Sequence, residues 1–266
     1  IANVTGGSYN TASFSMVGLT SSKALLIIND ANAGNDVAFV LDVASSTITV
    51  GAGVMAGAYT STDTVWMTAL TSSRALRIYV DVGTYEWSYV FWDVTGSTPT
   101  DGNVGSYAVS TTTLNQSSRS VMLATLSSTA CVMAVHNYAG GDTGTGGLEA
   151  RSITVSGNTS ALGDPVTVDT YDSSSYRADL KPRDASSAYL GWGNSDPTGT
   201  NNISVIGVSG LTVGIGSAGV STTRSDSSWT VAVAALGTSK AMTIWQWNDG
   251  IDLYINAFCW FTSALV

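Results

Sequence analysis

Charged side chains are scarce in this sequence, and basic ones are the scarcest. Among 266 residues only 11% are charged, with 10 Lys and Arg against 19 Asp and Glu, so the formal net charge is −9. A chain with that balance repels phosphate backbones and anionic membrane surfaces. Because no stretch clusters Lys or Arg, we expect no nucleic-acid partner.

Long apolar runs are also missing. The longest candidate, Ala257–Val266, is much shorter than the ~18 residues that span a bilayer, and it contains Thr262 and Ser263. We therefore expect no membrane insertion. The sequence starts at Ile1 with no charged segment ahead of an apolar one, so we expect a processed chain or a part of a longer protein.

The groups that most enzymes use are few. There is one histidine, His136, and the only glutamates are Glu86 and Glu149. One histidine and two distant cysteines do not make a His/Cys metal site, and no G-x-S-x-G nucleophile motif is present. The Asn29–Asp36 loop loosely resembles a calcium loop but lacks the closing glutamate. We expect no enzyme, no metal and no cofactor.

Cysteine gives no disulfide framework. Cys131 and Cys259 lie far apart, each inside an apolar strand pattern, and no framework spacing links them. We expect two buried thiols that act as small apolar side chains. A disulfide between them stays open as the alternative.

Apolar and small polar residues are what the chain has in quantity. Hydrophobic residues make up 44%, enough for a folded core. With so few charges, the surface must consist largely of Ser, Thr, Asn and Gly. That composition is common in extracellular and virion proteins, which is the location we expect.

A short sequence box recurs along the whole chain. It consists of a leucine, two or three small polar residues that often end in Lys or Arg, an alanine, and an apolar strand running into an Asx/Gly-rich turn. Two copies match almost letter for letter, Leu19–Asp30 and Leu70–Asp81. The five copies are anchored, at steps of 51, 55, 58 and 53 residues, on Ala24, Ala75, Ala130, Ala188 and Ala241. Such a period indicates a repeat architecture.

Each unit is expected to contain four short strands, because segments rich in β-branched and aromatic residues alternate with Gly, Ser, Asn and Asp. No window holds a helical apolar period, so the chain is predicted to be all-β. In the first unit the strands are Phe14–Leu19, Ala24–Ile28, Asp36–Val43 and Thr47–Val50. Later fourth strands are predicted at Ile153–Val155 and Leu211–Val213.

Four antiparallel strands per unit of about 50 residues are typical of a β-propeller blade. We predict one domain, residues 1–266, that forms a five-bladed β-propeller. The fifth unit lacks its outer part, and Ile1–Gly7 is the segment expected to close the ring as its last strand. The predicted blades are 12–62, 63–113, 114–172, 173–225, and 226–266 completed by 1–11.

The units resemble five-bladed propeller proteins, an architecture shared by tachylectin-like lectins and some glycosidases. Their Ser/Thr/Gly/Ala-rich sequence is also similar to propeller repeats of bacteriophage and bacterial surface proteins. The resemblance covers nearly the whole chain and implies the fold. It maps no ligand residue onto this sequence, and fold does not settle function.

The loops between the second and third strands of every unit carry the candidate binding residues. Asp and Asn bond sugar hydroxyls and aromatic rings stack on a pyranose, with Trp87 and Trp247 the tryptophans best placed beside turns. The alternative is that Asx and Gly are simply what tight turns require. The candidate ligand-binding residues are Asp30, Asn35, Asp36, Tyr85, Glu86, Trp87, Asn137, Tyr138, Asp142, Asn194, Asp196, Trp247, Asn248 and Asp249.

Three functions follow from these features. The first is a non-enzymatic structural or attachment module of a virion, phage tail or cell-surface layer, whose partners are other subunits of the assembly or a host surface. The second is a lectin that binds cell-surface glycans. The third is a glycoside hydrolase, which needs inward carboxylates. Against the hydrolase, we expect Glu149 to be an exposed partner of Arg151.

Overall fold

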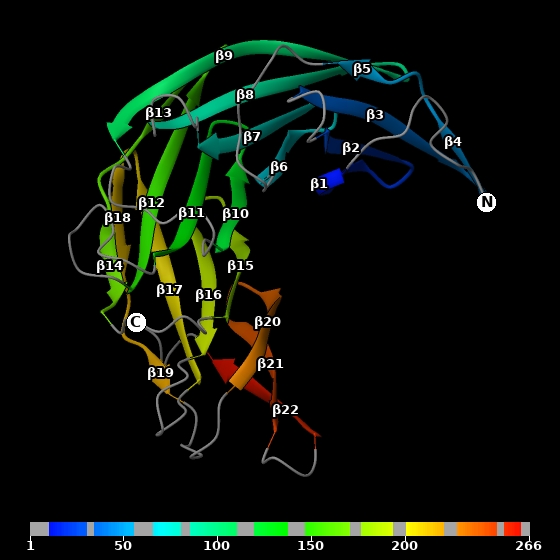
Figure 1. Ribbon diagram of the computed structural model, residues 1–266. Coiled ribbons are helices and arrows are strands. Elements are labelled where there is room, and N and C mark those ends of the chain that lie inside the picture. Colours follow the sequence, from blue (N-terminus) through cyan, green and yellow to red (C-terminus); the bar gives the residue numbers. More distant parts are fainter. Residues whose placement is uncertain are drawn as a thin grey trace. The chain divides into compact units, whose positions relative to one another are not determined.

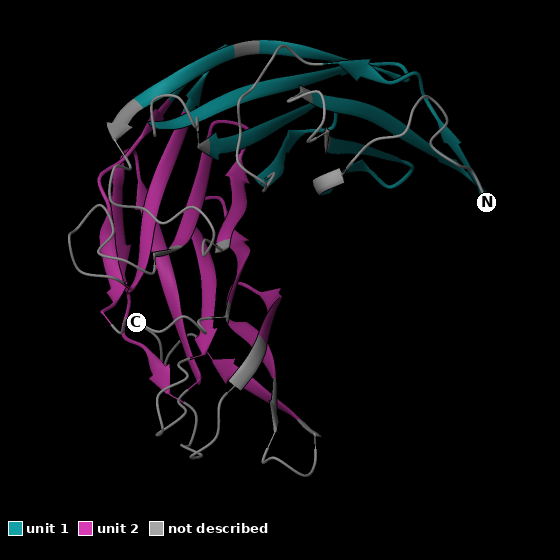
Figure 2. Cartoon of the chain, in the orientation of Figure 1, with its two compact units in different colours: residues 1–112, 155–160 teal, residues 113–154, 161–266 magenta. Residues whose placement is uncertain are grey.

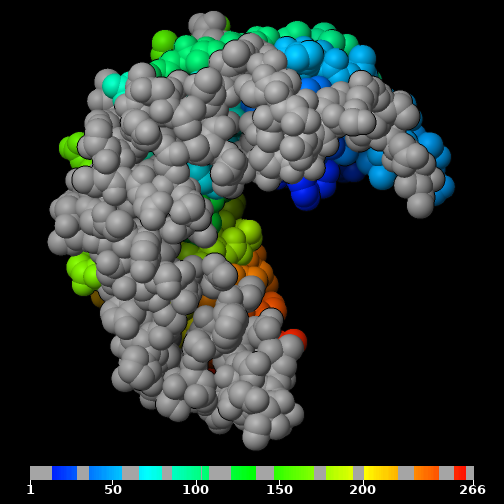
Figure 3. Space-filling model, in the orientation of Figure 1, coloured from blue at the N-terminus to red at the C-terminus, as the bar shows by residue number. Residues whose placement is uncertain are grey.

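The computed structural model describes residues 11–30, 35–55, 66–80, 86–110, 120–137, 147–170, 177–193, 201–220, 228–248 and 253–261 (Figures 1 and 3, coloured). Every regular element among these residues is a β-strand. None of them forms a helix long and apolar enough to cross a membrane. The prediction of an all-β chain is confirmed.

The strands form five antiparallel sheets, each built from consecutive strands in chain order (Figure 1). Sheet 1 contains β1 (Thr11–Thr20), β2 (Lys23–Asp30), β3 (Asn35–Ala44), β4 (Thr47–Val50) and β5 (Val54–Met55). Sheet 2 contains β6 (Trp66–Thr71), β7 (Arg74–Val80), β8 (Glu86–Thr95) and β9 (Thr98–Ser110).

The other three sheets repeat this order. Sheet 3 contains β10 (Ser120–Ser127), β11 (Ala130–Asn137), β12 (Gly147–Ser156), β13 (Thr159–Leu162) and β14 (Val166–Asp169). Sheet 4 contains β15 (Arg177–Asp184), β16 (Ser187–Gly193), β17 (Asn201–Ser209), β18 (Thr212–Ile215) and β19 (Gly219–Val220). Sheet 5 contains β20 (Ser228–Gly237), β21 (Lys240–Asn248) and β22 (Leu253–Phe261).

The chain divides into two compact units (Figure 2). Unit 1 comprises residues 1–112 and 155–160, and unit 2 comprises residues 113–154 and 161–266. Unit 1 therefore holds sheets 1 and 2 together with the turn between β12 and β13. Its main core cluster joins sheets 1 and 2 through residues such as Leu25, Val40, Val90 and Trp92. In unit 2, one cluster joins sheets 3 and 4 and another joins sheets 4 and 5.

The sequence box owes its recurrence to one repeated hairpin between first and second strands. In four sheets the residue that ends the first strand accepts a hydrogen bond from the backbone N–H two positions later; for example, Ser22 donates to Thr20 Oγ1 and Ser73 to Thr71 Oγ1. A register shift occurs at the same place in all five hairpins. Thr, Ser and Asp supply the acceptor that such a turn needs.

The structure shifts the alignment of the third copy of the box by one residue. The second strand starts at Lys23, Arg74 and Ala130 in the first three sheets, so Cys131 occupies the place of Ala24. The prediction that Ala130 is the anchor was wrong by one residue, because this hairpin has the same length as the others while its box lacks the basic residue. The structure also corrects a predicted boundary in sheet 3. Ile153–Val155, which was predicted to be a fourth strand, lies inside the third strand, β12, and the fourth strand is β13.

The hairpin between third and fourth strands has a fixed backbone conformation. Its first turn residue has positive φ in sheets 1 to 4: Ser45 (57°), Gly96 (63°), Gly157 (57°) and Gly210 (58°). A positive φ at this position suits the tight turns that match the twist of paired strands, and glycine adopts it at little cost.

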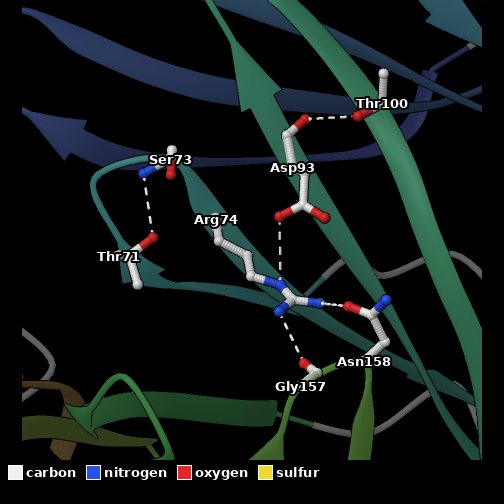
Figure 4. Close-up of polar contacts among 7 residues, drawn as sticks. All are labelled: Thr71, Ser73, Arg74, Asp93, Thr100, Gly157 and Asn158. Carbon is white, nitrogen blue, oxygen red and sulfur yellow. Dashed lines mark hydrogen bonds and ion pairs between the residues drawn. The ribbon is translucent and has the colours of Figure 1, made fainter.

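Basic side chains at the start of the second strand tie a sheet to the turn of the next. Lys23 Nζ donates to the carbonyl of Gly96 and pairs with Asp42. Arg74 donates to the Gly157 carbonyl at 2.8 Å and to Asn158 Oδ1 at 2.6 Å (Figure 4).

The Arg74 guanidinium is also held from its own sheet. Its Nε lies 3.3 Å from Asp93 Oδ1, and its plane covers the Phe91 ring at 4.2 Å from the centroid (Figure 4 shows the Asp93 contact). The planar fork of arginine suits this pair of acceptors.

Candidate ligand-binding site

Most of the predicted ligand-binding residues belong to loop ends whose side chains are not described. Six of them lie outside the described residues: Tyr85, Tyr138, Asp142, Asn194, Asp196 and Asp249. Five more lie in strands at the loop ends, although their side chains are outside the described part: Asp30, Asn35, Asn137, Trp247 and Asn248. Three have described side chains, and all three belong to unit 1: Asp36, Glu86 and Trp87.

Asp36 is buried between sheets 1 and 2 and is not open to a ligand. Its carboxylate forms an ion pair with Arg77 Nη1, and both side chains are 0% exposed. The Arg77 guanidinium lies 4.7 Å from the centre of the Tyr79 ring. The pair links the two packed sheets, and loss of either partner would leave the other charge buried without compensation. The prediction that Asp36 is a ligand-binding residue on an open loop face is therefore wrong, because its side chain is buried against Arg77.

Glu86 lies on the same face of sheet 2 as Arg77, at the loop end. Side chains alternate along a strand, so Glu86, Ser88 and Val90 share the face that packs on sheet 1. Ser106, which is paired with Ser88, donates its hydroxyl to Glu86 Oε2 at 2.6 Å. Ser88 is buried, Glu86 is half-buried and Ser106 is exposed. A buried ion pair, a buried serine and a half-buried carboxylate therefore lie on the face of sheet 2 that also carries the apolar cluster shared with sheet 1.

Trp87 is buried on the opposite face of the same strand. Only 1% of it is exposed, and its ring lies 6.0 Å from that of Trp66 at an angle of 50°. Trp66 is half-buried. Trp87 therefore packs against the ring of Trp66, and Trp66 is the one of the two that keeps an accessible surface.

The sequence analysis missed two residues of this region, Arg77 and Ser106, although the sequence around Arg77 indicates that it is unusual. Arg77 interrupts the apolar strand Ala75–Tyr79, and a charge within an apolar strand indicates a buried partner. Nothing in the sequence singles out Ser106, because its contact with Glu86 depends on the irregular pairing of β8 with β9.

Glu149, the second glutamate, is buried and not exposed as predicted. Glu149 was expected to be exposed beside Arg151, but both are buried in β12, with Arg151 donating to the Gly163 carbonyl at 3.1 Å. Cys259 also departs from expectation: Cys131 is buried, as predicted, whereas Cys259 is exposed, and both thiols are free. Burial raises the pKa of the Cys131 thiol to about 11, opposed by a hydrogen bond with Thr125.

Within the described residues, no three His, Cys, Asp or Glu side chains gather where a metal ion would bind. At its loop end, sheet 2 carries the Glu86 carboxylate and the Ser106 hydroxyl on the face toward sheet 1, and the Trp66 indole on the opposite face. Either set of groups can contact a neutral ligand with several hydroxyls.

No protein-family model matches the sequence, and no curated protein matches it. Solved structures similar to this one include AofleA from Arthrobotrys oligospora, with a TM-score of 0.48 and 12% identity over 94% of this chain and 83% of that chain. Another is a post-proline cleaving enzyme from Rickettsia typhi, with a TM-score of 0.37 and 11% identity over 90% of this chain and 33% of that chain.

Proposed function

We propose that this chain is a non-enzymatic attachment module that binds glycans at the loop ends of its sheets. The observation that carries the proposal is the loop end of sheet 2, where the half-buried Trp66 of β6 lies beside Trp87 on one face and Glu86 of β8 accepts a hydrogen bond from Ser106 on the other. An indole stacks on the apolar face of a sugar ring, and a carboxylate accepts hydrogen bonds from its hydroxyls. Because the Trp66 ring already packs against Trp87, it loses little conformational freedom when it binds a sugar.

The proposal includes the arrangement that the repeat predicts. The five sheets are blades of one ring, and the N-terminal segment Ile1–Gly7 supplies a last strand to sheet 5. The module acts at an extracellular or virion surface, with cell-surface glycans and neighbouring subunits as its partners. The scarcity of charge supports this location, because uncharged polar surfaces are common there.

The test is a glycan array followed by titration of any sugar that binds. Trp66→Ala is expected to weaken binding about 2- to 30-fold, since a stacked ring contributes about 0.5–2 kcal/mol. Glu86→Gln should weaken binding about 3- to 30-fold. The matched controls are Phe261→Ala, an exposed aromatic on sheet 5, and Asp101→Asn, an exposed acid on β9. Binding that survives both site variants, or no binding at millimolar sugar, contradicts the proposal.

A second candidate function is packing within an assembly. Sheet 1 exposes two large apolar side chains on one face of β1, Phe14 (72%) and Met16 (62%). Neighbouring apolar side chains at such exposure are typical of a protein contact surface. Sedimentation should then show self-association that the double variant Phe14→Ser/Met16→Ser abolishes. A monomer at every concentration contradicts self-packing.

A further inference from the structure

Sheet 4 carries an open pocket of about 490 Å³ whose lining residues all belong to unit 2. Its walls come from the first hairpin of the sheet and from the third and fourth strands, β17 and β18. The volume falls in the range of about 300–1,000 Å³ that is usual for small-molecule sites. The pocket is therefore large enough for a ligand, and its lining determines which kind.

Arg183, one of the lining residues, stands where the repeated box has a leucine. Asp184 pairs with Ser187 as Thr20 pairs with Lys23, and the residue before it is Arg183 in sheet 4 and a leucine in sheet 1. Leucine occupies the same position in all four other sheets, as Leu19, Leu70, Leu126 and Leu236. Leu19 and Leu70 are buried core residues. An arginine does not replace a core leucine, so sheet 4 differs from the repeat at this position.

A pair of small residues opens the pocket beside this arginine. Ser187 pairs with Gly207, whereas the same two positions of sheet 1 hold the ion pair of Lys23 and Asp42. Among the described residues, a Cβ on Gly207 would meet one atom within 4 Å, the Gly214 carbonyl oxygen at 3.8 Å. The long side chains that fill this place in sheet 1 are thus replaced by open space in sheet 4.

The Arg183 side chain is held at one nitrogen. Its Nε donates to the Thr238 carbonyl at 2.7 Å and lies 3.7 Å from Asp184 Oδ2. Within the part of the chain that the structure describes, neither Nη atom donates a hydrogen bond to the protein. A guanidinium that is already held keeps its remaining N–H donors for a ligand and loses little freedom when one binds.

Asp184 places an acceptor next to these donors. Its Oδ1 accepts hydrogen bonds from the Ser186 N–H at 2.9 Å and from the Ser186 hydroxyl at 3.0 Å, so the carboxylate is also held in place. Arg183 and Asp184 are the two charged residues of the lining, and their charges cancel. The pocket therefore favours an ion of neither sign.

The rest of the lining combines hydroxyl groups with an apolar wall. Val205 and Val208 supply the apolar surface. The hydroxyls, each of which donates and accepts, are those of Ser186, Ser187, Ser209 and Thr212. A ligand with hydroxyls around its edge and C–H groups on its faces matches both kinds of wall, and neutral sugars have this chemistry.

We propose that the pocket of sheet 4 binds a neutral mono- or disaccharide. Arg183 donates to sugar hydroxyls, Asp184 accepts from them, and the valines contact the C–H face of the ring. The site belongs to one sheet, because sheet 4 alone combines arginine at the leucine position with a serine–glycine pair. It is separate from the loop end of sheet 2, and it stands whether or not Trp66 and Glu86 bind glycan.

Amide NMR of the isotope-labelled chain tests this site. The probes are glucose, galactose, mannose, N-acetylglucosamine and lactose, and at least one should shift the Gly207 and Gly214 amides in a saturable way. The Trp66 indole N–H reports separately on the loop end of sheet 2. Shifts at Trp66 alone would support that other site and overturn this one. A pocket whose amides do not respond to any probe at high millimolar concentration also overturns it.

Two variants assign the binding to the pocket. Gly207→Val places a side chain in the open space and should weaken binding at least about tenfold. Its control is Gly18→Val, the same change at a strand glycine of sheet 1 that has open space around it. Arg183→Leu restores the residue of the other four sheets and should weaken binding about 10- to 100-fold. Unchanged affinity in either pocket variant overturns the proposal.

Glucuronate and galacturonate distinguish a sugar site from an anion site. Because the lining has no net charge, these acids should bind no more tightly than glucose and galactose. Tighter binding of an acid, abolished by Arg183→Leu, would show an anion site held by the arginine and would overturn the proposal.

Discussion

The buried pair of Asp36 and Arg77 gives the sharpest test of how sheets 1 and 2 are held together. Asp36→Leu leaves the Arg77 charge buried without its counter-ion, and Arg77→Met leaves the carboxylate in the same position. Because both side chains are fully buried, each single change should cost about 3–5 kcal/mol. For a chain of this size that lowers Tm by roughly 6–20 °C. The double variant replaces the pair with apolar groups and should cost far less than the two single changes together.

Urea unfolding followed by tryptophan fluorescence measures these costs, since Trp92 lies in the core cluster between the two sheets. The coupling free energy from the four proteins should be at least about 3 kcal/mol in favour of the pair. Lys181→Met is the control, because Lys181 is 46% exposed in its contact with Asp179, and it should cost less than about 1 kcal/mol. If the two single costs simply add in the double variant, the ion pair does not couple the sheets and the reasoning fails.

Three further measurements test individual contacts. In native protein at pH 8 a thiol reagent should modify Cys259 alone, and Cys131 should react only after unfolding, because it is buried and its raised pKa keeps it protonated; two fast thiols would contradict this. Arg74→Met should lower stability by about 1–3 kcal/mol by removing charge-assisted bonds, and an unchanged urea midpoint would show that they contribute nothing. A hydrogen bond from Ser97, opposed by burial and aided by Lys23, lowers the pKa of Asp42. The stabilising contribution of Asp42 is therefore present above the unfolded pKa of about 3.9 and is lost as pH falls through the folded pKa. Asp42→Asn should therefore flatten the loss of stability between about pH 5 and pH 2, and an unaltered acid profile would refute that assignment.

The strands of this protein could be predicted because their physical causes are local. The four strands expected in the first unit correspond to β1 to β4, since alternating apolar residues and small turn residues specify them without distant contacts. The boundary error at Ile153–Val155 has a different origin. Gly157 and Asn158 form the turn, but Ser156 and Gly157 together are equally good as the end of a fourth strand. Pairing across the sheet decides between these readings, and one unit's sequence does not contain that information.

The candidate site was harder to predict for the same reason. Trp87 and Trp66 look alike as aromatic residues near strand ends, and both lie on the same face of sheet 2. Trp87 is the covered one because β8 is an inner strand of the sheet, whereas Trp66 belongs to the edge strand β6. The polar loop residues were predicted to bind ligand from their residue type alone. Asp36 shows that such a residue can instead lie in a buried contact between two sheets. The sequence repeat identifies the strands and turns of each sheet, whereas the exposure of a single residue depends on how neighbouring strands and sheets pack on it.

The repeated contact between a basic residue and the next sheet's turn makes a last prediction for sheet 3, which has no basic residue at that position. Ala130 starts the second strand of sheet 3, where sheets 1 and 2 have Lys23 and Arg74, and the turn of sheet 4 rests on sheet 3 at Gly163. Ala130→Arg should therefore donate to the Gly210 carbonyl as Arg74 donates to Gly157, and raise the free energy of unfolding by about 0.5–1.5 kcal/mol. Reducing the net negative charge of the chain also raises stability in a general way, so Thr129→Arg on the neighbouring exposed turn is the control with the same charge. A gain at position 130 that exceeds the gain at 129 supports a specific contact, and equal gains would show that charge alone is responsible.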